Sequence, residues 1–281
     1  MNAIEVNGIS RAYPGFLLDH ISFSLPTGTI LGLVGENGAG KSTLMKLILG
    51  MIRADSGSVS VLGYNDLRAN PKIREDLGVV MDESCFPAVM KAAEIGTMMS
   101  MIYRNWDERD FEHLLAVLGI PKDKMFGKLS RGNKMKLGIA CALSHHPKLL
   151  ILDEATSGLD PVVRDELLDI LLDFTRDESH SILMSSHIMS DLEKACDYIV
   201  FLHEGRILLS GEKDLLLEQY GKVCCSRERF AQISSAAVIG KRETDYGVEC
   251  IAGREALSGA VKVQPVGLEE LFVMMVKGGK E

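Results

Sequence analysis

The strongest constraint on the fold is a glycine-rich loop that joins an apolar run to a segment of helical periodicity. Residues 35–42 read GENGAGKS and fit the pattern G-x-x-x-x-G-K-[ST]. The preceding residues 29–34 are mostly apolar and predict a buried strand, and residues 43–50 predict a helix. Glycines let successive backbone N–H groups turn inward, and the positive end of the helix faces the same point. This order predicts a cradle for phosphate oxygens.

Within this loop the residue types suggest separate roles. The backbone N–H groups are expected to surround the phosphates, Lys41 to reach the outer phosphates, and the Ser42 hydroxyl to ligate Mg²⁺. A glycine turn of purely structural use is the alternative, and the strand before the loop and the helix after it argue against it. The candidate nucleotide-binding residues here are Gly35, Asn37, Gly38, Ala39, Gly40, Lys41, Ser42 and Thr43.

A second apolar run, residues 149–152, ends in two adjacent acids, Asp153 and Glu154. Successive side chains of a strand point to opposite faces, so the two acids are expected to act differently. Asp153 suits a metal ion held against the phosphates, and Glu154 suits the polarisation of an attacking water molecule. The alternative is a strand that ends in solvated acids, and the phosphate loop in the same chain weighs against it.

Strands alternate with helices along the first 211 residues, which predicts an α/β core with parallel pairing. After Gly211 the pattern changes, and we expect two parts: residues 1–211 and a small accessory region, residues 212–281. Within that region helices are expected over residues 213–220 and 267–276. The other predicted strands are residues 3–6, 21–25 and 181–185, and the other predicted helices are residues 88–103, 108–118, 130–144, 164–174 and 189–196.

The net charge argues against one class of partner. The formal net charge is -8, which disfavours a phosphate backbone as a partner, so nucleic acid is not expected.

The cysteines and the apolar runs bear on redox state and on membrane insertion. The 6 cysteines form no C-x-x-C pair and are expected to be reduced. The N-terminal residues lack the pattern of a secretory signal, and no apolar run reaches about 18 residues. We therefore do not expect the chain to cross a membrane by itself.

The chain contains further motifs besides the phosphate loop and the paired acids. The string LLILDEATSGLD follows LSRGNKMKLGIACALSHHP and precedes SSH, and this series resembles the ATPase subunit of ABC transporters. The resemblance runs from Ala3 to about Gly211. It implies ATP and Mg²⁺ as cofactors. It also implies a P-loop NTPase core, an antiparallel β subdomain, a helical signature subdomain and a small C-terminal accessory region.

The resemblance assigns roles to single residues. Tyr13 lies where the family stacks an aromatic ring on adenine. Ser130 and Gly132 lie in the signature segment, which binds the γ-phosphate of ATP held by the opposite subunit. Asp160 corresponds to the aspartate that communicates across the dimer. His187 corresponds to the switch histidine, which contacts γ-phosphate and orients the water, so the catalytic candidates are Glu154, His187 and Lys41.

The sequence departs from the family in two places. The signature reads LSRGN, with Arg131 in place of the usual glycine and Asn133 in place of glutamine. Asp82 stands where the family has a glutamine that touches Mg²⁺ and water. An aspartate can still approach a metal, so we count Asp82 with Ser42 and Asp153 as metal candidates. We expect Asp82 to alter the rate or coupling of hydrolysis.

The short accessory region and the terminal VGLEELFVMMV segment resemble bacterial exporter ATPases. This implies two copies of the chain around ATP, a separate integral membrane permease docked near residues 82–101, and a place at the cytoplasmic face of the membrane. The cargo expected from the resemblance is a peptide or drug. One alternative is a cassette ATPase that acts on ribosomes or DNA, against which the single phosphate loop and the acidic charge argue. A small-molecule phosphotransferase would not explain the signature segment and His187 together.

Overall fold

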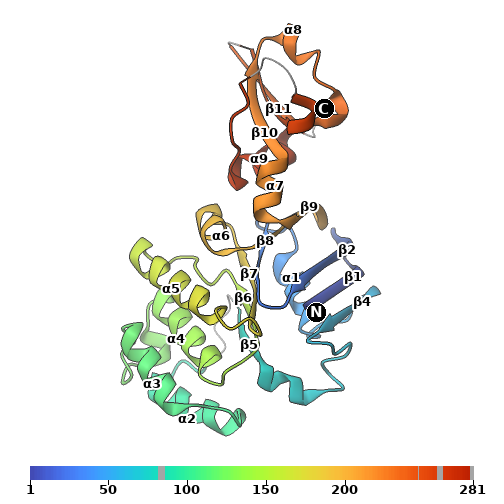
Figure 1. Cartoon of the computed structure of the whole chain (residues 1–281). Helices are drawn as coiled ribbons and strands as arrows, with labels where there is room; N and C mark the ends of the chain where they lie inside the picture. Colours follow the sequence, from blue (N-terminus) through green and yellow to red (C-terminus); the bar gives the residue numbers. More distant parts are fainter. Residues whose placement is uncertain (82–85, 246, 258–261, 279–281) are drawn as a thin grey trace.

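The computed structural model describes residues 1–81, 86–245, 247–257 and 262–278. Its largest sheet has six strands, which run β5-β6-β7-β3-β8-β9 across the sheet (Figure 1). The first five of these pair in parallel, and only β9 is antiparallel to its neighbour β8. The predicted α/β class with parallel pairing is confirmed. The strands are β3 (Ile30–Val34), β5 (Leu77–Val80), β6 (Leu149–Asp153), β7 (Ser181–Ser186), β8 (Tyr198–His203) and β9 (Arg206–Glu212).

The register of this sheet brings the predicted motifs to one edge. Val34 of β3 lies opposite Ser186 of β7, and Asp153 of β6 lies opposite Ser185 of β7. The segments that leave the carboxyl ends of β3, β6 and β7 therefore start side by side. This edge is where open α/β sheets bind ligands.

A second, antiparallel sheet has the order β2-β1-β4. Its strands are β1 (Asn2–Tyr13), β2 (Phe16–Pro26) and β4 (Ser56–Val61). The strands predicted over residues 3–6 and 21–25 are present but longer, because β1 pairs with both neighbours and absorbs several register shifts. Helix α1 (Lys41–Ile48) shares a buried apolar core with this sheet.

The predicted helices of the middle segment are also present. They are α2 (Ala92–Ile102), α3 (Glu108–Val117), α4 (Arg131–Leu143), α5 (Pro161–Phe174) and α6 (Met189–Ala195), with short 3-10 turns η1 (Pro71–Asp76) and η2 (Phe126–Lys128). Helix α2 starts later than the predicted residue 88, since Lys91 is extended and its backbone N–H donates to the Glu94 carboxylate. Helix α5 starts earlier than residue 164, since Asp160 caps it and Pro161 fits the first turn.

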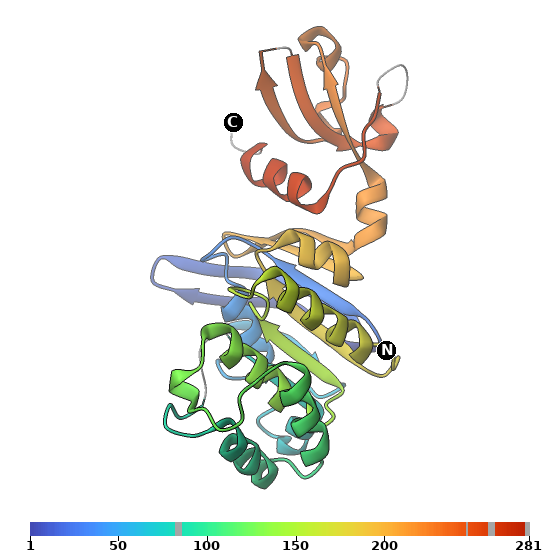
Figure 2. The ribbon, with the colours of Figure 1, turned by 90° about the vertical axis from the view of Figure 1, so that its left-hand side faces the viewer.

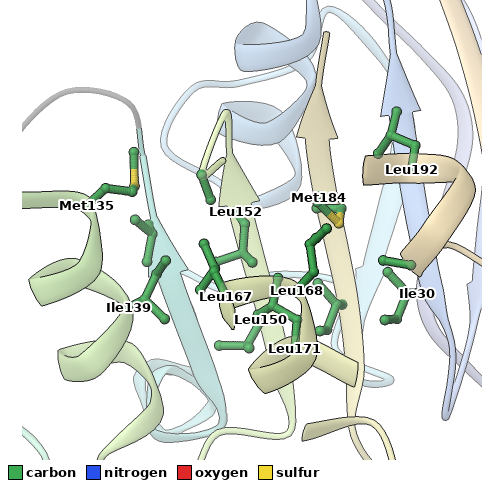
Figure 3. Packing of buried hydrophobic residues seen from close by; sticks show 14 of the residues in the cluster. Ile30, Met135, Ile139, Leu150, Leu152, Leu167, Leu168, Leu171, Met184 and Leu192 are labelled. Atoms are coloured by element: carbon green, nitrogen blue, oxygen red, sulfur yellow. The ribbon is translucent and has the colours of Figure 1, made fainter. Parts of the chain in front are cut away.

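Buried aliphatic side chains join these helices to the six-stranded sheet. Leu167, Leu168 and Leu171 of α5 lie against Leu150 and Met184 of the sheet, and all five are at most 2% exposed (Figure 3). Strands buried on both faces read as continuous apolar runs, which is why β6 was recognisable from sequence. Within the described residues, no helix is both long and apolar enough to cross a bilayer.

The C-terminal part has a sheet of its own, with strand order β10-β12-β11. Its elements are α7 (Lys213–Gln219), β10 (Tyr220–Cys225), α8 (Arg227–Phe230), η3 (Ser235–Ala237), β11 (Val238–Thr244), β12 (Gly247–Gly253), η4 (Arg254–Leu257) and α9 (Leu268–Gly278). The predicted helices α7 and α9 are confirmed, whereas the three strands were not predicted. Helix α9 lies on the side of this small sheet that faces the rest of the molecule (Figure 2).

Candidate functional site

The phosphate loop leaves β3 at Gly35 and enters α1 at Lys41. Gly38 and Gly40 have φ angles of 84° and 109°, in the left-handed region that favours glycine. A Cβ atom on Gly40 would lie 2.8 Å from the Phe16 ring, and one on Gly35 would lie 2.5 Å from the Leu202 carbonyl oxygen. The loop therefore needs glycine both for its backbone angles and for its close approach to β2 and β8.

Lys41 is the first residue of α1 and is only 6% exposed. Its Nζ donates to the Gly35 carbonyl at 2.7 Å and to the Glu36 carbonyl at 3.3 Å. The same nitrogen lies 3.4 Å from Glu154 Oε1. The structure thus brings the lysine of the first motif to the acid of the second, 113 positions apart in the numbering.

The two acids differ in environment, as the sequence predicts. Asp153 is 2% exposed, and its Oδ1 accepts a hydrogen bond of 2.6 Å from Ser185 Oγ. Glu154 has φ 52°, so the chain leaves the strand direction there. Its backbone N–H donates to the same Ser185 Oγ at 3.0 Å. Ser185 was missed as a site residue, because nothing in the run SILMSS distinguishes it from Ser181 and Ser186.

The Glu154 carboxylate lies between two cationic or basic groups. Its Oε2 is 2.6 Å from His187 Nδ1, and its Oε1 is 3.4 Å from Lys41 Nζ. Among the described residues Oε1 has no hydrogen-bond partner although it is buried, because the lysine contact is an ion pair without hydrogen-bond geometry. This oxygen therefore keeps an unused acceptor position next to the Lys41 ammonium.

Lys41 and Glu154 line an open hollow of about 700 Å³, whereas Asp153 and His187 are not among the described residues that line it. Tyr13, at the end of β1, lines it from one side and is 39% exposed. The Arg11 guanidinium lies 5.1 Å from the centre of the Tyr13 ring and pairs with Asp55 at 2.6 Å. From the predicted set, the lining includes Tyr13, Asn37, Gly38, Gly40, Lys41, Ser42, Thr43 and Glu154.

Ser130, Gly132 and Asp160 are not among the described residues that line this hollow. Ser130 caps α4 by accepting the Asn133 N–H at 3.2 Å, and Asp160 caps α5 by accepting the Val163 N–H at 3.2 Å. A Cβ on Gly132 would lie 3.0 Å from Leu159, so the two helix starts are in contact.

Of the two departures from the family pattern, the structure describes the one at Arg131. The aliphatic part of Arg131 lies over Gly158, where a Cβ would be 3.6 Å from Arg131 Cδ. Arg131 also lines a separate groove of about 540 Å³ with Val80, Phe86 and Met135. Asp82 lies outside the described residues.

Comparison with known proteins agrees with this geometry. A family profile described as "ABC transporter" matches residues 18–157. The bacitracin transport ATP-binding protein BcrA of Bacillus licheniformis is 34% identical over 193 residues; the alignment covers 68% of this chain and 63% of BcrA, just under two thirds of that relative. The lantibiotic transport ATP-binding protein SrtF of Streptococcus pyogenes is 36% identical over 218 residues, covering 75% of this chain and 91% of SrtF.

A solved structure described as the ATP-binding subunit of an ABC transporter superposes with a TM-score of 0.73 at 26% identity. The superposition covers 98% of this chain and 100% of that chain, so the C-terminal region is included. The phosphate loop, the paired acids, the fold and the relatives all indicate the same protein family. The chain belongs to the ABC transporter family, as one of its ATP-binding, ATP-hydrolysing proteins.

Proposed function

We propose that this chain is the motor subunit of an exporter that moves a peptide or peptide-like drug through a separate membrane permease. The names of BcrA and SrtF, which are transport proteins for bacitracin and lantibiotics, support this cargo class. On this proposal the chain lies at the cytoplasmic face of the membrane, bound to its permease. Residues 1–211 form the ATPase part and residues 212–281 the accessory region; β9 ends at Glu212, next to this boundary.

The observation that carries the catalytic proposal is the Glu154 carboxylate, held between Lys41 and His187 with one buried oxygen lacking a hydrogen bond. We assign Glu154 as the base that accepts a proton from the attacking water. His187 orients that water and the carboxylate. Lys41 is assigned to the outer phosphates, since its ammonium already lies within the curled loop.

Mg²⁺ fits the oxygen donors at this edge of the sheet. Ser42 presents an exposed hydroxyl in the hollow, and Asp153 presents a carboxylate at the end of β6. Among the described residues there is no group of three or more metal-ligating side chains. Mg²⁺ commonly takes one or two protein ligands plus substrate phosphates, so Ser42 and Asp153 would hold it with ATP. Asp82 is a further candidate ligand.

A pair of copies would complete the site. The hollow carries Tyr13 and the phosphate loop, while Ser130, Gly132 and Asp160 are not among the described residues that line it. In a head-to-tail pair, Ser130 and Gly132 would meet the γ-phosphate bound by the opposite copy, with Tyr13 stacked on adenine. Asp160 would communicate across this interface.

The permease is expected to dock near residues 82–101. Val89 is 75% exposed and Met101 is 81% exposed, so this segment offers apolar side chains to a partner. The groove that Arg131 lines opens in the same part of the molecule, between β5 and helices α2 and α4.

Replacement of Asp82 by Gln should change the ATPase rate or its stimulation by the permease. If both values are unchanged, Asp82 does not alter the rate or the coupling of hydrolysis.

Replacement of Glu154 by Gln tests the catalytic assignment. The amide keeps the shape of the carboxylate but is a poor base, so we expect kcat to fall by about 10²–10⁴-fold while ATP binding is retained. Steady-state ATPase assays and equilibrium binding of ATP measure the two effects. Wild-type hydrolysis by the variant would refute Glu154 as the base.

A pull-down from detergent-solubilised membranes of the native host, with ATPase rates measured before and after, tests the transport assignment. A stoichiometric polytopic partner that changes the rate supports the exporter proposal. A ribosomal or DNA-repair partner, with nothing from the membrane, would overturn it and leave the ATPase chemistry standing. The acidic net charge of -8 favours the first outcome.

A further inference from the structure

Helix α6 begins at Met189, two residues after His187. The His187 side chain is 52% exposed, so packing around the ring does little to fix it. The Ile188 N–H donates to Ser186 Oγ at 3.0 Å, which ties the short link to the end of β7. The distance of 2.6 Å between His187 and Glu154 therefore depends on where the backbone of β7 and of α6 lies.

One side of α6 is held by α5. Lys194 Nζ lies 2.6 Å from Asp165 and 2.9 Å from Asp169, and Arg164 lies 3.2 Å from the buried Asp191. These contacts stay within the ATPase part of the chain. They involve only the side of α6 that faces α5.

That other side is held by the C-terminal helix α9. The Glu193 side chain accepts the backbone N–H of Leu268, the first residue of α9, at 2.7 Å. A carboxylate at this position satisfies a backbone donor that has no partner inside its own helix, and its charge suits the positive end of α9. The Glu193 carbonyl also accepts Lys213 Nζ at 2.8 Å, which adds the start of α7.

Apolar packing continues the same contact. Leu268 and Leu271 of α9 are fully buried and belong to the core cluster that includes Leu192 of α6. The ring of Phe272 meets Phe201 of β8 edge to face, with centroids 5.2 Å apart. Figure 2 shows α9 turned towards the six-stranded sheet rather than towards solvent. The C-terminal helix α9 thus completes the core next to α6, the helix that follows His187.

We propose that α9 is a positioning element of the hydrolytic site: Phe272 packs α9 against β8, Glu193 joins α9 to α6, and α6 holds His187 against Glu154. This inference rests on the proposed role of His187. It gives the accessory region a direct effect on turnover, whereas a region that only covers a sheet edge would have none. Glu193 and Phe272 touch no reacting atom, so both are positioning residues.

Replacement of Glu193 by Ala removes the acceptor for the Leu268 N–H, and replacement by Gln keeps it. We expect kcat of the Ala variant to fall by about three- to tenfold, the range that one lost hydrogen bond supplies. The KM for ATP should stay within about twofold, because the phosphate loop is unaffected. The Gln variant should recover most of the wild-type kcat. Glu269→Ala, at an exposed position of the same helix, is the matched control and should leave kcat unchanged.

Phe272→Leu gives a second test, because it removes the edge-to-face ring contact but keeps apolar volume against Phe201. It too should lower kcat without raising KM. Thermal unfolding of each variant establishes that assays are run well below Tm. Kinetics equal to wild type for both Glu193→Ala and Phe272→Leu in the folded state would overturn the proposal. So would a Gln variant as slow as the Ala variant.

The failure of this inference is distinguishable from failure of the proposed function. If Glu154→Gln is inactive while the Glu193 and Phe272 variants turn over like wild type, the catalytic base stands and α9 is only structural. If Glu154→Gln hydrolyses ATP normally, Glu154 is not the catalytic base. The placement of His187 against Glu154 by α9 then has no catalytic consequence.

Discussion

One hydroxyl organises both acids of the site. Ser185 Oγ donates to Asp153 and accepts from the Glu154 backbone, and Ser185 is itself fully buried. The hydroxyl thereby fixes the Asp153 carboxylate and the left-handed turn at Glu154 together. A backbone angle of this kind costs about 1–3 kcal/mol and persists where neighbouring groups hold it.

We expect Ser185→Ala to lower stability by about 1–3 kcal/mol and also to lower kcat, because a buried carboxylate and a buried N–H both lose their partner. Ser181→Ala is the matched control on the same strand, where the hydroxyl accepts the Gly28 N–H far from the acids. Denaturant unfolding and steady-state kinetics separate the two effects. Equal kcat for the two variants would show that Ser185 has no part in the site.

At the scale of elements, side-chain caps decide where the helices begin. Ser130, Asp160 and Asp107 each accept backbone N–H groups of the first turn of α4, α5 and α3. Two of these caps coincide with residues assigned to the dimer interface, since a helix start offers both a cap and free N–H groups for an anion. Asp107, by contrast, lies in none of the assigned functional segments.

The Asp107 cap predicts a pH dependence of stability. Its pKa is held below the ordinary value of an aspartate, mainly by the Asp110 backbone N–H. The ionised cap therefore stabilises the fold above about pH 4, and this contribution is lost as pH falls through the lower pKa of the folded state. Asp107→Asn keeps a capping oxygen but does not titrate. Its Tm should fall less steeply than that of wild type between about pH 5 and pH 2, and parallel curves would contradict this.

At the scale of the whole molecule, the proposals concern a pair of copies and the contact between the C-terminal helix and α6. Ser130 is not among the described residues that line the hollow with the phosphate loop, as the proposed head-to-tail pair requires. Helix α9 returns from the end of the chain to the core beside α6. On our proposal, turnover therefore depends on a part of the sequence that carries no motif.

Glu154→Gln with ATP and Mg²⁺ should form a stable dimer, because closure is not followed by hydrolysis. Light scattering or analytical ultracentrifugation would show a doubled mass that disappears without ATP. Adding Ser130→Ala should weaken this dimer by about tenfold or more, since a hydrogen bond to a charged phosphate is lost in each site. Ser226→Ala is the matched control, an exposed serine that caps α8 in the same way. Equal dimerisation of the two double variants would contradict the cross-subunit role of Ser130.

The sequence alone determined the local chemistry of this protein. The glycine pattern before Lys41 and the apolar strand before Asp153 depend on short-range backbone geometry, so both strands, the loop and the helix after it were predicted within a few residues. Helices with strong periodicity, such as α3 and α4, were placed for the same reason. Tyr13 and His187 came only through resemblance, since neither has a local pattern of its own.

Only the tertiary structure decided which distant groups meet. Strands β10, β11 and β12 have short apolar runs broken by charges, and their strand state depends on pairing with each other rather than on local preference. The contacts of Lys41 with Glu154, of Ser185 with both acids, and of Glu193 with α9 join positions far apart in the chain. Sheet order and core packing create such contacts, because they are properties of the folded chain and of no single segment.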